Sequence, residues 1–355
     1  MPARRPGGVH AARRARCAAR RVGRGTGAKA RARADVLGYS LIVDDVVRPD
    51  GATFMGKLGG GGPQALFGAR VFDAAHDDAM ALGLCAKVGS DIPFECLKWL
   101  SDLKVDLQLL AIDPAIPTPR AWQVCELDGR RTQVWRTAHG EQQVACLRPE
   151  WQEGTSTRAI HVGIDVEHPP WGVLERARES GALVSVETFK PAASPLPRDH
   201  LRKLADAVDF LSPNLVEARA MLGADASEAD APAAARLLAD AGVPHAIVRA
   251  GASGAAWACP DGSLWHAPSV SGISVVDDTG CGNAHCGAVL AAFLAHQAPA
   301  SCLSWGASAA SLILEHVGVP PAATARLRRD DARARAAAVA ARVTSAAALP
   351  FERGP

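Results

Sequence analysis

The 355-residue sequence has no apolar run long enough to cross a membrane as a helix. Its longest apolar stretches, 288–295 and the serine-interrupted 307–314, fall well short of the roughly 18 residues that a spanning helix needs. We therefore expect no transmembrane segment and no membrane partner. Apolar residues make up 48% and charged residues 21% of the chain, a composition typical of a globular protein with a packed core.

The sequence also lacks any C-x-x-C pair, and its nine cysteines are an odd number. They are scattered along the chain at positions 17, 85, 96, 125, 146, 259, 281, 286 and 302. This pattern argues against a disulfide framework and favours free thiols in a reducing compartment.

Acidic residues and serine are missing from residues 1–34, which contain ten arginines and Lys29. Without this leader the chain carries 28 basic and 37 acidic residues, a net charge of −9. An arginine-rich, acid-free leader suggests a transit peptide for a chloroplast or mitochondrion. The missing serine and the weak apolar stripe fit a disordered start of a cytoplasmic protein equally well, and we expect no nucleic-acid partner.

No internal repeat of 20–50 residues is present, which argues against solenoids and propellers. From residue 35 short apolar segments alternate with amphipathic ones, which indicates an α/β fold with a mostly parallel sheet. The segments expected to be strands are 36–43, 81–88, 159–162, 183–186, 210–211 and 246–248.

Two regions depart from this alternation. Residues 122–135 read WQVCELDGRRTQVW, two alternating runs around Asp128-Gly129, which predicts a β-hairpin. With residues 44–57 this hairpin is expected to form a small β lid, spanning about 44–57 and 120–137. Residues 321–355 are rich in alanine and arginine and predict a C-terminal helix or tail, so the globular domain is expected over 35–320.

No G-x-G-x-x-G opens a helix after a strand, which argues against a dinucleotide-binding dehydrogenase. Instead residues 275–296, VVDDTGCGNAHCGAVLAAFLAH, predict a strand end, a glycine-rich turn and a long apolar helix. Gly280 and Gly282 permit a tight turn and close approach of a ligand. The free amides and positive dipole at the helix start then form an anion site.

The segment DDTGCGN at 277–283 resembles the D-x-T-G-A-G-D signature of the PfkB (ribokinase-like) carbohydrate kinases. Three further segments resemble the same family in the same order, between about residues 35 and 318. They are GGGGPQA at 59–65, similar to the sugar-side turn, LSPNLVEARAMLG at 211–223, similar to N-x-x-E, and VRAGASGAAW at 248–257, similar to the nucleotide strand and turn.

The resemblance implies a three-layer α/β/α sandwich, ATP and Mg²⁺ as cofactors, with K⁺ as a further option, and a sugar or sugar-like substrate. It places the anion hole at Gly280, Cys281 and Gly282, and the indirect magnesium contact at Glu217. The nucleotide would lie along Asn214, Glu217, Arg249, Gly251, Gly254, Asp277 and Thr279. The acceptor would lie near Asp44 or Asp45, Gly60, Gly61 and Gln64, under a lid that could also form a homodimer.

Asn283 stands where the family has the aspartate that takes the proton from the attacking hydroxyl. An amide has no accessible protonation at neutral pH, so it cannot serve as this base. Because a positioned base typically contributes about 10²–10⁴ in rate, two hypotheses stay open. The protein is a kinase, weakened or rescued by water, Asp277 or Asp278, or it is an inactive pseudokinase that serves as a nucleotide-binding or scaffold protein.

Two smaller departures accompany Asn283. Gln64 replaces a sugar-contacting Asn, and Arg249 replaces the nucleotide-side Thr, where its charge could face phosphates or turn outward. Some of the motif residues also have a purely structural interpretation. Asn214 and Glu217 suit a helix N-cap and a first-turn acid, and Asp44 and Asp45 suit the edge of a strand.

Overall fold

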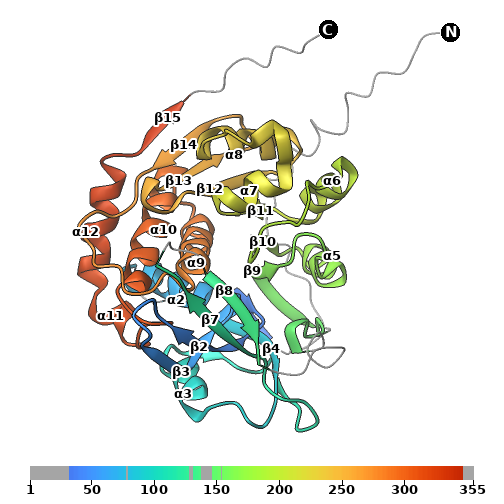
Figure 1. Ribbon diagram of the computed structural model, residues 1–355, viewed down its shortest axis with the longest axis vertical. Coiled ribbons are helices and arrows are strands. Elements are labelled where there is room, and N and C mark those ends of the chain that lie inside the picture. The colour runs from blue at the N-terminus through green and yellow to red at the C-terminus, as the bar shows by residue number, and fades with distance from the viewer. Residues whose placement is uncertain (1–31, 77–78, 128–130, 137–145, 153, 347–355) are drawn as a thin grey trace, which may run out of the picture.

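The computed structural model describes residues 32–76, 79–127, 131–136, 146–152 and 154–346, and these residues form two β-sheets with helices around the larger one (Figure 1). The expected leader lies outside the described residues up to residue 31, and β1 already begins at Ala32. Within the part described, no helix is both long and apolar enough to span a bilayer.

The larger sheet contains eleven strands among the described residues. Its order is β15 (Thr344–Ala346), β14 (Leu264–Ala267), β13 (Ala255–Ala258), β12 (His245–Arg249), β11 (Phe210–Leu211), β10 (Leu183–Thr188), β9 (Thr155–Ile164), β1 (Ala32–Tyr39), β4 (Leu82–Val88) and β5 (Val105–Asp106), and β6 (Leu110–Ile112) also pairs with β4. The pairings from β12 to β5 are parallel, and β13 to β15 add an antiparallel edge. The expected mostly parallel sheet is therefore confirmed.

The strand predicted over residues 36–43 is wrong as a single element. The chain leaves the large sheet after Tyr39 and enters a second sheet with β2 (Ile42–Val47). Ser40 has a positive φ of 67°, and this left-handed residue turns the chain between the two sheets. Both halves are apolar because both are buried, so hydrophobicity alone could not show the break.

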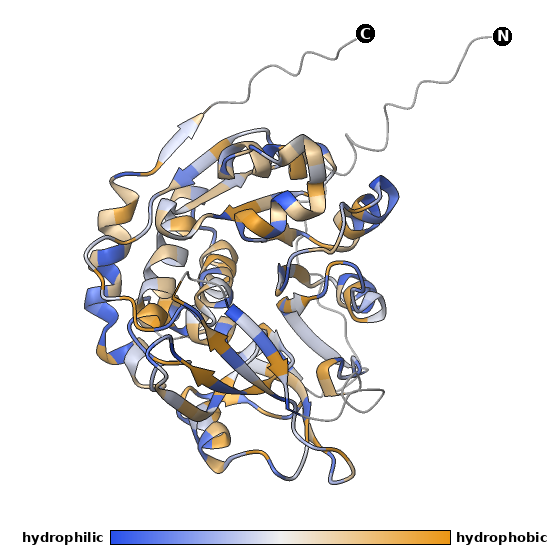
Figure 2. Cartoon of the chain, in the orientation of Figure 1, coloured by the Kyte–Doolittle hydropathy of each residue, from blue (hydrophilic) through white to orange (hydrophobic). Residues whose placement is uncertain are grey.

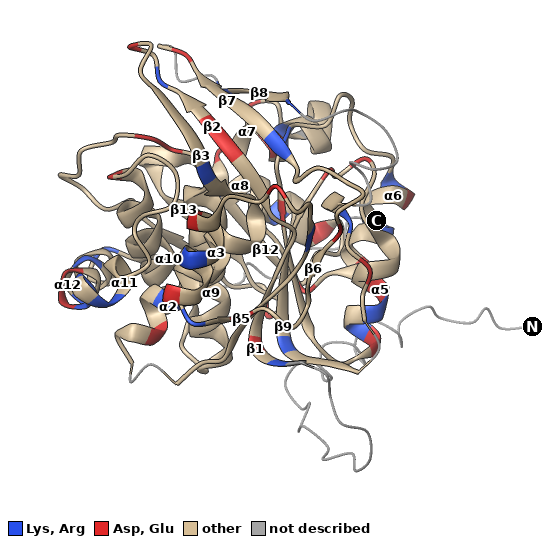
Figure 3. Cartoon of the chain, turned by 90° about the horizontal axis from the view of Figure 1, so that it is seen from below, with Lys and Arg blue, Asp and Glu red and all other residues tan. Residues whose placement is uncertain are grey.

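The second sheet is the expected lid, in the order β3 (Thr53–Gly59), β2, β7 (Arg120–Cys125) and β8 (Arg131–Trp135). Strands β7 and β8 pair antiparallel, with Trp122 opposite Val134, as the hairpin prediction requires. The predicted turn at Asp128-Gly129 lies outside the described residues. Figure 3 shows the lid strands projecting from the large sheet.

Helices cover both faces of the large sheet, which gives the ribokinase-like three-layer arrangement. One face carries α5 (Trp171–Glu179), α6 (Arg198–Ala207), α7 (Leu215–Leu222) and α8 (Ala231–Asp240), with η1 (Gly223–Ala226) after α7. The other carries α2 (Gly61–Ala74), α3 (Phe94–Asp102), α9 (Cys281–Leu294), α10 (Pro299–Leu314), α11 (Thr324–Leu327) and α12 (Arg329–Ala340). Hydrophilic residues concentrate on the outer helices α5, α6 and α12 (Figure 2).

Two glycines let the backbones of α2 and α9 touch. A Cβ added at Gly68 of α2 would overlap the carbonyl of Ala284, and one at Gly287 of α9 would overlap the carbonyl of Ala65. The contact is reciprocal, so the small residues of each helix face the backbone of the other. Because α2 follows the glycine turn at 59–61 and α9 follows the Gly280 loop, this crossing fixes the two loops relative to each other.

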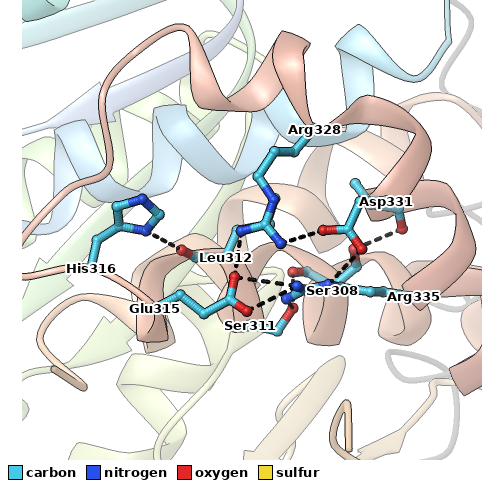
Figure 4. Close-up of polar contacts among 9 residues, drawn as sticks. Ser308, Ser311, Leu312, Glu315, His316, Arg328, Asp331 and Arg335 are labelled. Carbon is cyan, nitrogen blue, oxygen red and sulfur yellow. Dashed lines mark hydrogen bonds and ion pairs between the residues drawn. The ribbon is translucent and has the colours of Figure 1, made fainter. Parts of the chain in front are cut away.

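The C-terminal α12 is clamped to α10 by an ionic cluster at its first turns (Figure 4). Arg335 donates to Glu315 at 2.9 Å and to Asp331 at 3.0 Å, and Arg328 donates to both carboxylates. Ser308 adds a 2.8 Å bond to the carbonyl of Ala332. The arginine-rich segment therefore forms a docked helix, followed by β15 at the sheet edge, up to residue 346.

A buried histidine next to Phe210 makes stability depend on pH. The His245 ring stacks on Phe210 at 4.5 Å, and its Nδ1 has no partner among the described residues. Burial lowers the pKa of His245 to about 4, so between pH 6.5 and 4 the unfolded chain binds a proton that the native protein does not. Stability therefore falls as the pH falls through this window.

We expect His245→Phe to keep the ring contacts and remove this loss. Between pH 7 and pH 5 the unfolding free energy of the parent should fall by about 2 kcal/mol more than that of the variant. Urea unfolding at both pH values measures it, with the exposed His168→Gln as a control that should keep the parent's pH dependence. Equal losses for parent and His245→Phe would contradict this account.

Candidate active site

The glycine loop before α9 is shaped by Asp277. Its Oδ1 accepts the N–H of Thr279 at 2.9 Å and its Oδ2 accepts the N–H of Gly318 at 2.8 Å. Gly280 is the N-cap of α9 and has a φ of 87°, a left-handed conformation that favours glycine. Asp277 thus fixes the backbone of this loop, and both of its oxygens already accept hydrogen bonds.

The first turn of α9 presents free donors. The N–H groups of Gly282 and Asn283 have no acceptor in the part of the chain that the structure describes. Unpaired N–H groups at a helix start carry the positive end of the helix dipole and favour anions. The Oγ1 of Thr279 is also buried without a partner within the described residues. These donors fit phosphate oxygens.

Arg249 turns inward and lies against Gly282. Its guanidinium donates to Glu187 at 2.8 Å and to the carbonyl of Ser212 at 2.7 Å, and a Cβ added at Gly282 would overlap it. Burial raises the pKa of the Glu187 carboxyl, which Arg249 opposes. The start of α9 is therefore lined by a fixed cation that a buried carboxylate holds in place.

Asn214 and Glu217 form a reciprocal capping box at the start of α7. The Asn214 side chain accepts the N–H of Glu217 at 2.9 Å, and Glu217 Oε2 accepts the N–H of Asn214 at 2.8 Å. The same oxygen accepts the Thr188 hydroxyl at 2.5 Å. The structural interpretation of both residues is thus correct. It does not exclude a ligand role, because Oε1 of Glu217 has no donor among the described residues.

Asn283 belongs to a neutral chain of hydrogen bonds. Its Oδ1 lies 2.9 Å from His161 Nε2, and its Nδ2 donates to Gln64 Oε1 at 3.0 Å. On its other side, His161 Nδ1 lies 3.1 Å from the Ser185 hydroxyl. Burial lowers the pKa of His161 to about 4, so the ring is neutral at pH 7. In this arrangement Asn283 accepts from His161 and turns its donor side to Gln64.

Gln64 connects this chain to the glycine loop. A Cβ added at Gly280 would overlap the Gln64 amide, and one at Gly61 would lie 3.0 Å from Asn283 Oδ1. The structure therefore brings Gln64, Gly61, Gly280 and Asn283 together, although about 220 residues separate the two pairs. Gly60 has a φ of 87° and starts α2 just beside them.

The structure separates Asp44 from Asp45. Their partners on β7, Gln123 for Asp44 and Arg120 for Asp45, lie on opposite faces of that strand, so the two carboxylates point to opposite faces of the lid. Each carboxylate oxygen of Asp45 accepts an N–H of the Arg120 guanidinium at 2.8 Å. Asp45 also accepts from Arg136 and from the N–H of Gly56. Burial raises the pKa of Asp45, but these bonds outweigh burial and hold it below its usual value. Both oxygens of Asp45 therefore hold residues of the lid together.

Asp44 faces the other way, toward the glycine loop. Its Oδ1 accepts the Gln123 amide at 2.8 Å, and its carboxylate lies against Gly59. Gln123 and Cys125 share one face of β7, and Cys125 Sγ lies within 4.8 Å of carboxylate oxygens of Asp277 and Asp278. Asp44 is thus the lid carboxylate on the face that meets the loop.

Four further residues at the site were not found from the sequence: His161, Ser185, Glu187 and Arg131. Arg131 of β8 is exposed and close enough to Asp44, Glu187 and Cys281 to lower the pKa of each. Arg131 comes from the hairpin and the other three from strands that carry no glycine motif. The only local signal was the polar character of 185–188 at the end of a buried strand.

The remaining nucleotide-side glycines differ in their environment. Gly251, with a φ of 54°, has open space around its Cα, as a ligand-facing turn requires. Gly254, with a φ of 92°, packs against the carbonyl of Ala267, so the fold alone explains it. Taken together, the residues fit a nucleotide and its magnesium: the α9 donors and Arg249 would hold phosphates, and Glu217, whose Oε1 has no donor among the described residues, would hold the ion.

Comparison with known proteins places the chain in a family. A family model described as pfkB family carbohydrate kinase matches residues 51–325. No curated protein sequence is significantly similar to the chain.

Several solved structures share the fold at low sequence identity. Ribokinase from Cryptococcus neoformans var. grubii serotype A, in complex with ADP, is 18% identical with a TM-score of 0.65, covering 83% of this chain and 99% of that one. Aminoimidazole riboside kinase from Salmonella enterica, complexed with aminoimidazole riboside and an ATP analogue, is 17% identical with a TM-score of 0.65, covering 85% and 99%. A putative ribokinase II from E. coli, in complex with ATP and Mg²⁺, is 15% identical with a TM-score of 0.63, covering 85% and 99%.

Proposed function

Since the chain belongs to the pfkB family of carbohydrate kinases, we propose that it transfers the γ-phosphoryl group of ATP to a hydroxyl of a sugar or sugar-like molecule. The observation that carries this proposal is the first turn of α9, where the N–H groups of Gly282 and Asn283 have no acceptor within the described residues and the Arg249 guanidinium lies against Gly282. Phosphoryl transfer depends chiefly on positioning and on stabilising charge, and these groups supply both.

The two substrates would bind on opposite sides of the Gly280 loop. The nucleotide would lie along Asn214, Glu217, Arg249 and Gly251, and Glu217 would hold Mg²⁺, which would supply positive charge to neutralise the phosphates. The acceptor lies under the lid against Asp44, Gly60, Gly61 and Gln64. The kinase from Salmonella enterica is named for a riboside, which supports a ribose-containing acceptor for this chain as well.

The lid also supports a homodimer. Met55 of β3 and Val134 of β8 are each 48% exposed and are apolar side chains that a partner surface could bury. A second copy packed on this surface would cover them, as the resemblance to the family suggests.

One observation favours the alternative of an inactive pseudokinase. The Asn283 side chain is satisfied by His161 and Gln64, so the position of the base is filled by a stable neutral arrangement. Such a protein would bind nucleotide at the same loop without turnover.

Acceptor-dependent ADP formation, screened over sugars and nucleosides, separates the two functions. We expect the parent protein to turn over with at least one acceptor, and Asn283→Asp to turn over with the same one. In that variant His161 Nε2 would donate to the new carboxylate and hold it at the acceptor side. An inert parent with an active Asn283→Asp variant would establish the pseudokinase, and failure of the parent to bind ATP would refute both functions.

A further inference from the structure

The glycine turn before α2 has a carboxylate at one end and an amide at the other. The Asp44 carboxylate lies against Gly59, and Asn283 Oδ1 lies 3.0 Å from the Cβ position of Gly61. Gly59 and Gly61 are two residues apart, which is at most about 7 Å of chain. Asp44 and Asn283 therefore border the same short turn, one from the lid and one from α9.

Asp44 has an oxygen available for a proton. Its Oδ1 accepts from Gln123, and its Oδ2 has no donor among the residues that the structure describes. Its side chain is 2% exposed, so it is nearly withdrawn from bulk water.

Burial raises the pKa of Asp44 to about 7, and the Gln123 bond only partly offsets this. An acid-base group is most effective when its pKa lies near the working pH. The charged or titratable groups around Asp44 are Arg131, which lowers its pKa, and Asp277, which raises it, together with its cross-strand neighbour Lys57 and Cys96 of α3. Asp45 on the far face of the lid also raises its pKa.

The other carboxylates of the site are poorly placed to take a proton. Both oxygens of Asp277 accept backbone N–H groups, and Asp45 is held by two arginines on the far face of the lid. Asp278 is exposed and lies beside Cys125. Glu187 is paired with Arg249. Asp44 is the carboxylate that combines burial, a free oxygen and a place on the acceptor side.

We propose that Asp44 is the catalytic base of this protein, in place of the residue that Asn283 has replaced. This inference rests on the proposed kinase function. The acceptor oxygen forms a bond to the γ-phosphorus, the bond from that phosphorus to the bridging oxygen breaks, and its electron pair leaves with ADP. The hydroxyl proton moves to Asp44 Oδ2, while the Asn283 amide takes no proton and keeps its hydrogen bonds to His161 and Gln64.

The test removes the carboxylate at position 44 and introduces one at position 283, at the other end of the turn. Four proteins are compared in steady-state kinetics with an acceptor identified for the parent: the parent, Asp44→Asn, Asn283→Asp and the double variant. Asp44→Asn keeps an acceptor oxygen for the sugar but cannot take a proton, so kcat should fall by about 10²–10⁴ with a much smaller change in KM. The kcat of the double variant should be at least tenfold higher than that of Asp44→Asn.

The pH profile provides a second readout. The parent's kcat/KM should rise with pH through about 7, because Asp44 must be ionised. In the double variant the rise should move to lower pH, because His161 donates to the carboxylate at position 283. The exposed lid residue Asp50, replaced by Asn, is the matched control and should stay within twofold of the parent.

Other outcomes overturn the proposal while leaving the kinase intact. A variant Asp44→Asn that raises KM without lowering kcat shows that Asp44 only anchors the acceptor. A parent profile that is flat between pH 6 and 8 shows that its ionisation is not needed. A parent with no acceptor-dependent ADP formation refutes the kinase function itself, and with it this inference.

Discussion

Replacing Arg249 with methionine is expected to destabilise the protein by about 3–5 kcal/mol at pH 8, the usual cost of leaving a buried charge without its partner. Glu187 would lose its 2.8 Å ion pair in a site where burial already raises the pKa of its carboxyl. Without Arg249 the pKa of this carboxyl rises further, so a larger fraction of it is protonated at pH 5 than at pH 8 and the loss of stability should be smaller there. Urea unfolding at both pH values measures this difference.

The double variant Arg249→Met and Glu187→Met separates stability from binding. It removes both charges, so most of the lost stability should return. Binding of ATP, followed by calorimetry, should stay at least tenfold weaker than in the parent, because the cation at the start of α9 is gone. If the double variant bound ATP as well as the parent, Arg249 would serve the fold alone.

Gly287→Ala is expected to cost about 3 kcal/mol or more and to abolish acceptor-dependent ADP formation. The added methyl group would overlap the carbonyl of Ala65, so α9 and α2 would have to move apart. That shift would separate Asn283 from Gln64 and Gly280 from the acceptor turn. Unfolding and turnover measured on the same preparation give both effects.

Gly172→Ala is the matched control for this change. Gly172 lies in α5 with nothing within 4 Å of its Cβ position, so alanine there should be neutral or stabilise by up to about 1 kcal/mol. If Gly287→Ala proved as harmless as Gly172→Ala, the helix crossing would be less tight than its backbone contacts indicate.

Much of the fold followed from local sequence because the relevant signals are periodic and short in range. Buried parallel strands appear as apolar runs, the hairpin at 122–135 as two alternating runs around a turn, and the α9 loop as glycines between a strand and an apolar helix. The segment 36–43 was misread because two consecutive strands in different sheets are both buried, and only the left-handed Ser40 separates them.

The sequence by itself determined the order of the elements, the glycine loop and the presence of an amide rather than a carboxylate at position 283, since each depends on residue type within a few positions. Only the tertiary structure decided that Arg249 faces Glu187, that His161 and Gln64 satisfy Asn283, and that Asp44 rather than Asp45 faces the loop. These are contacts between residues dozens to hundreds of positions apart. They follow from how the lid, α2 and α9 pack, which no local pattern specifies.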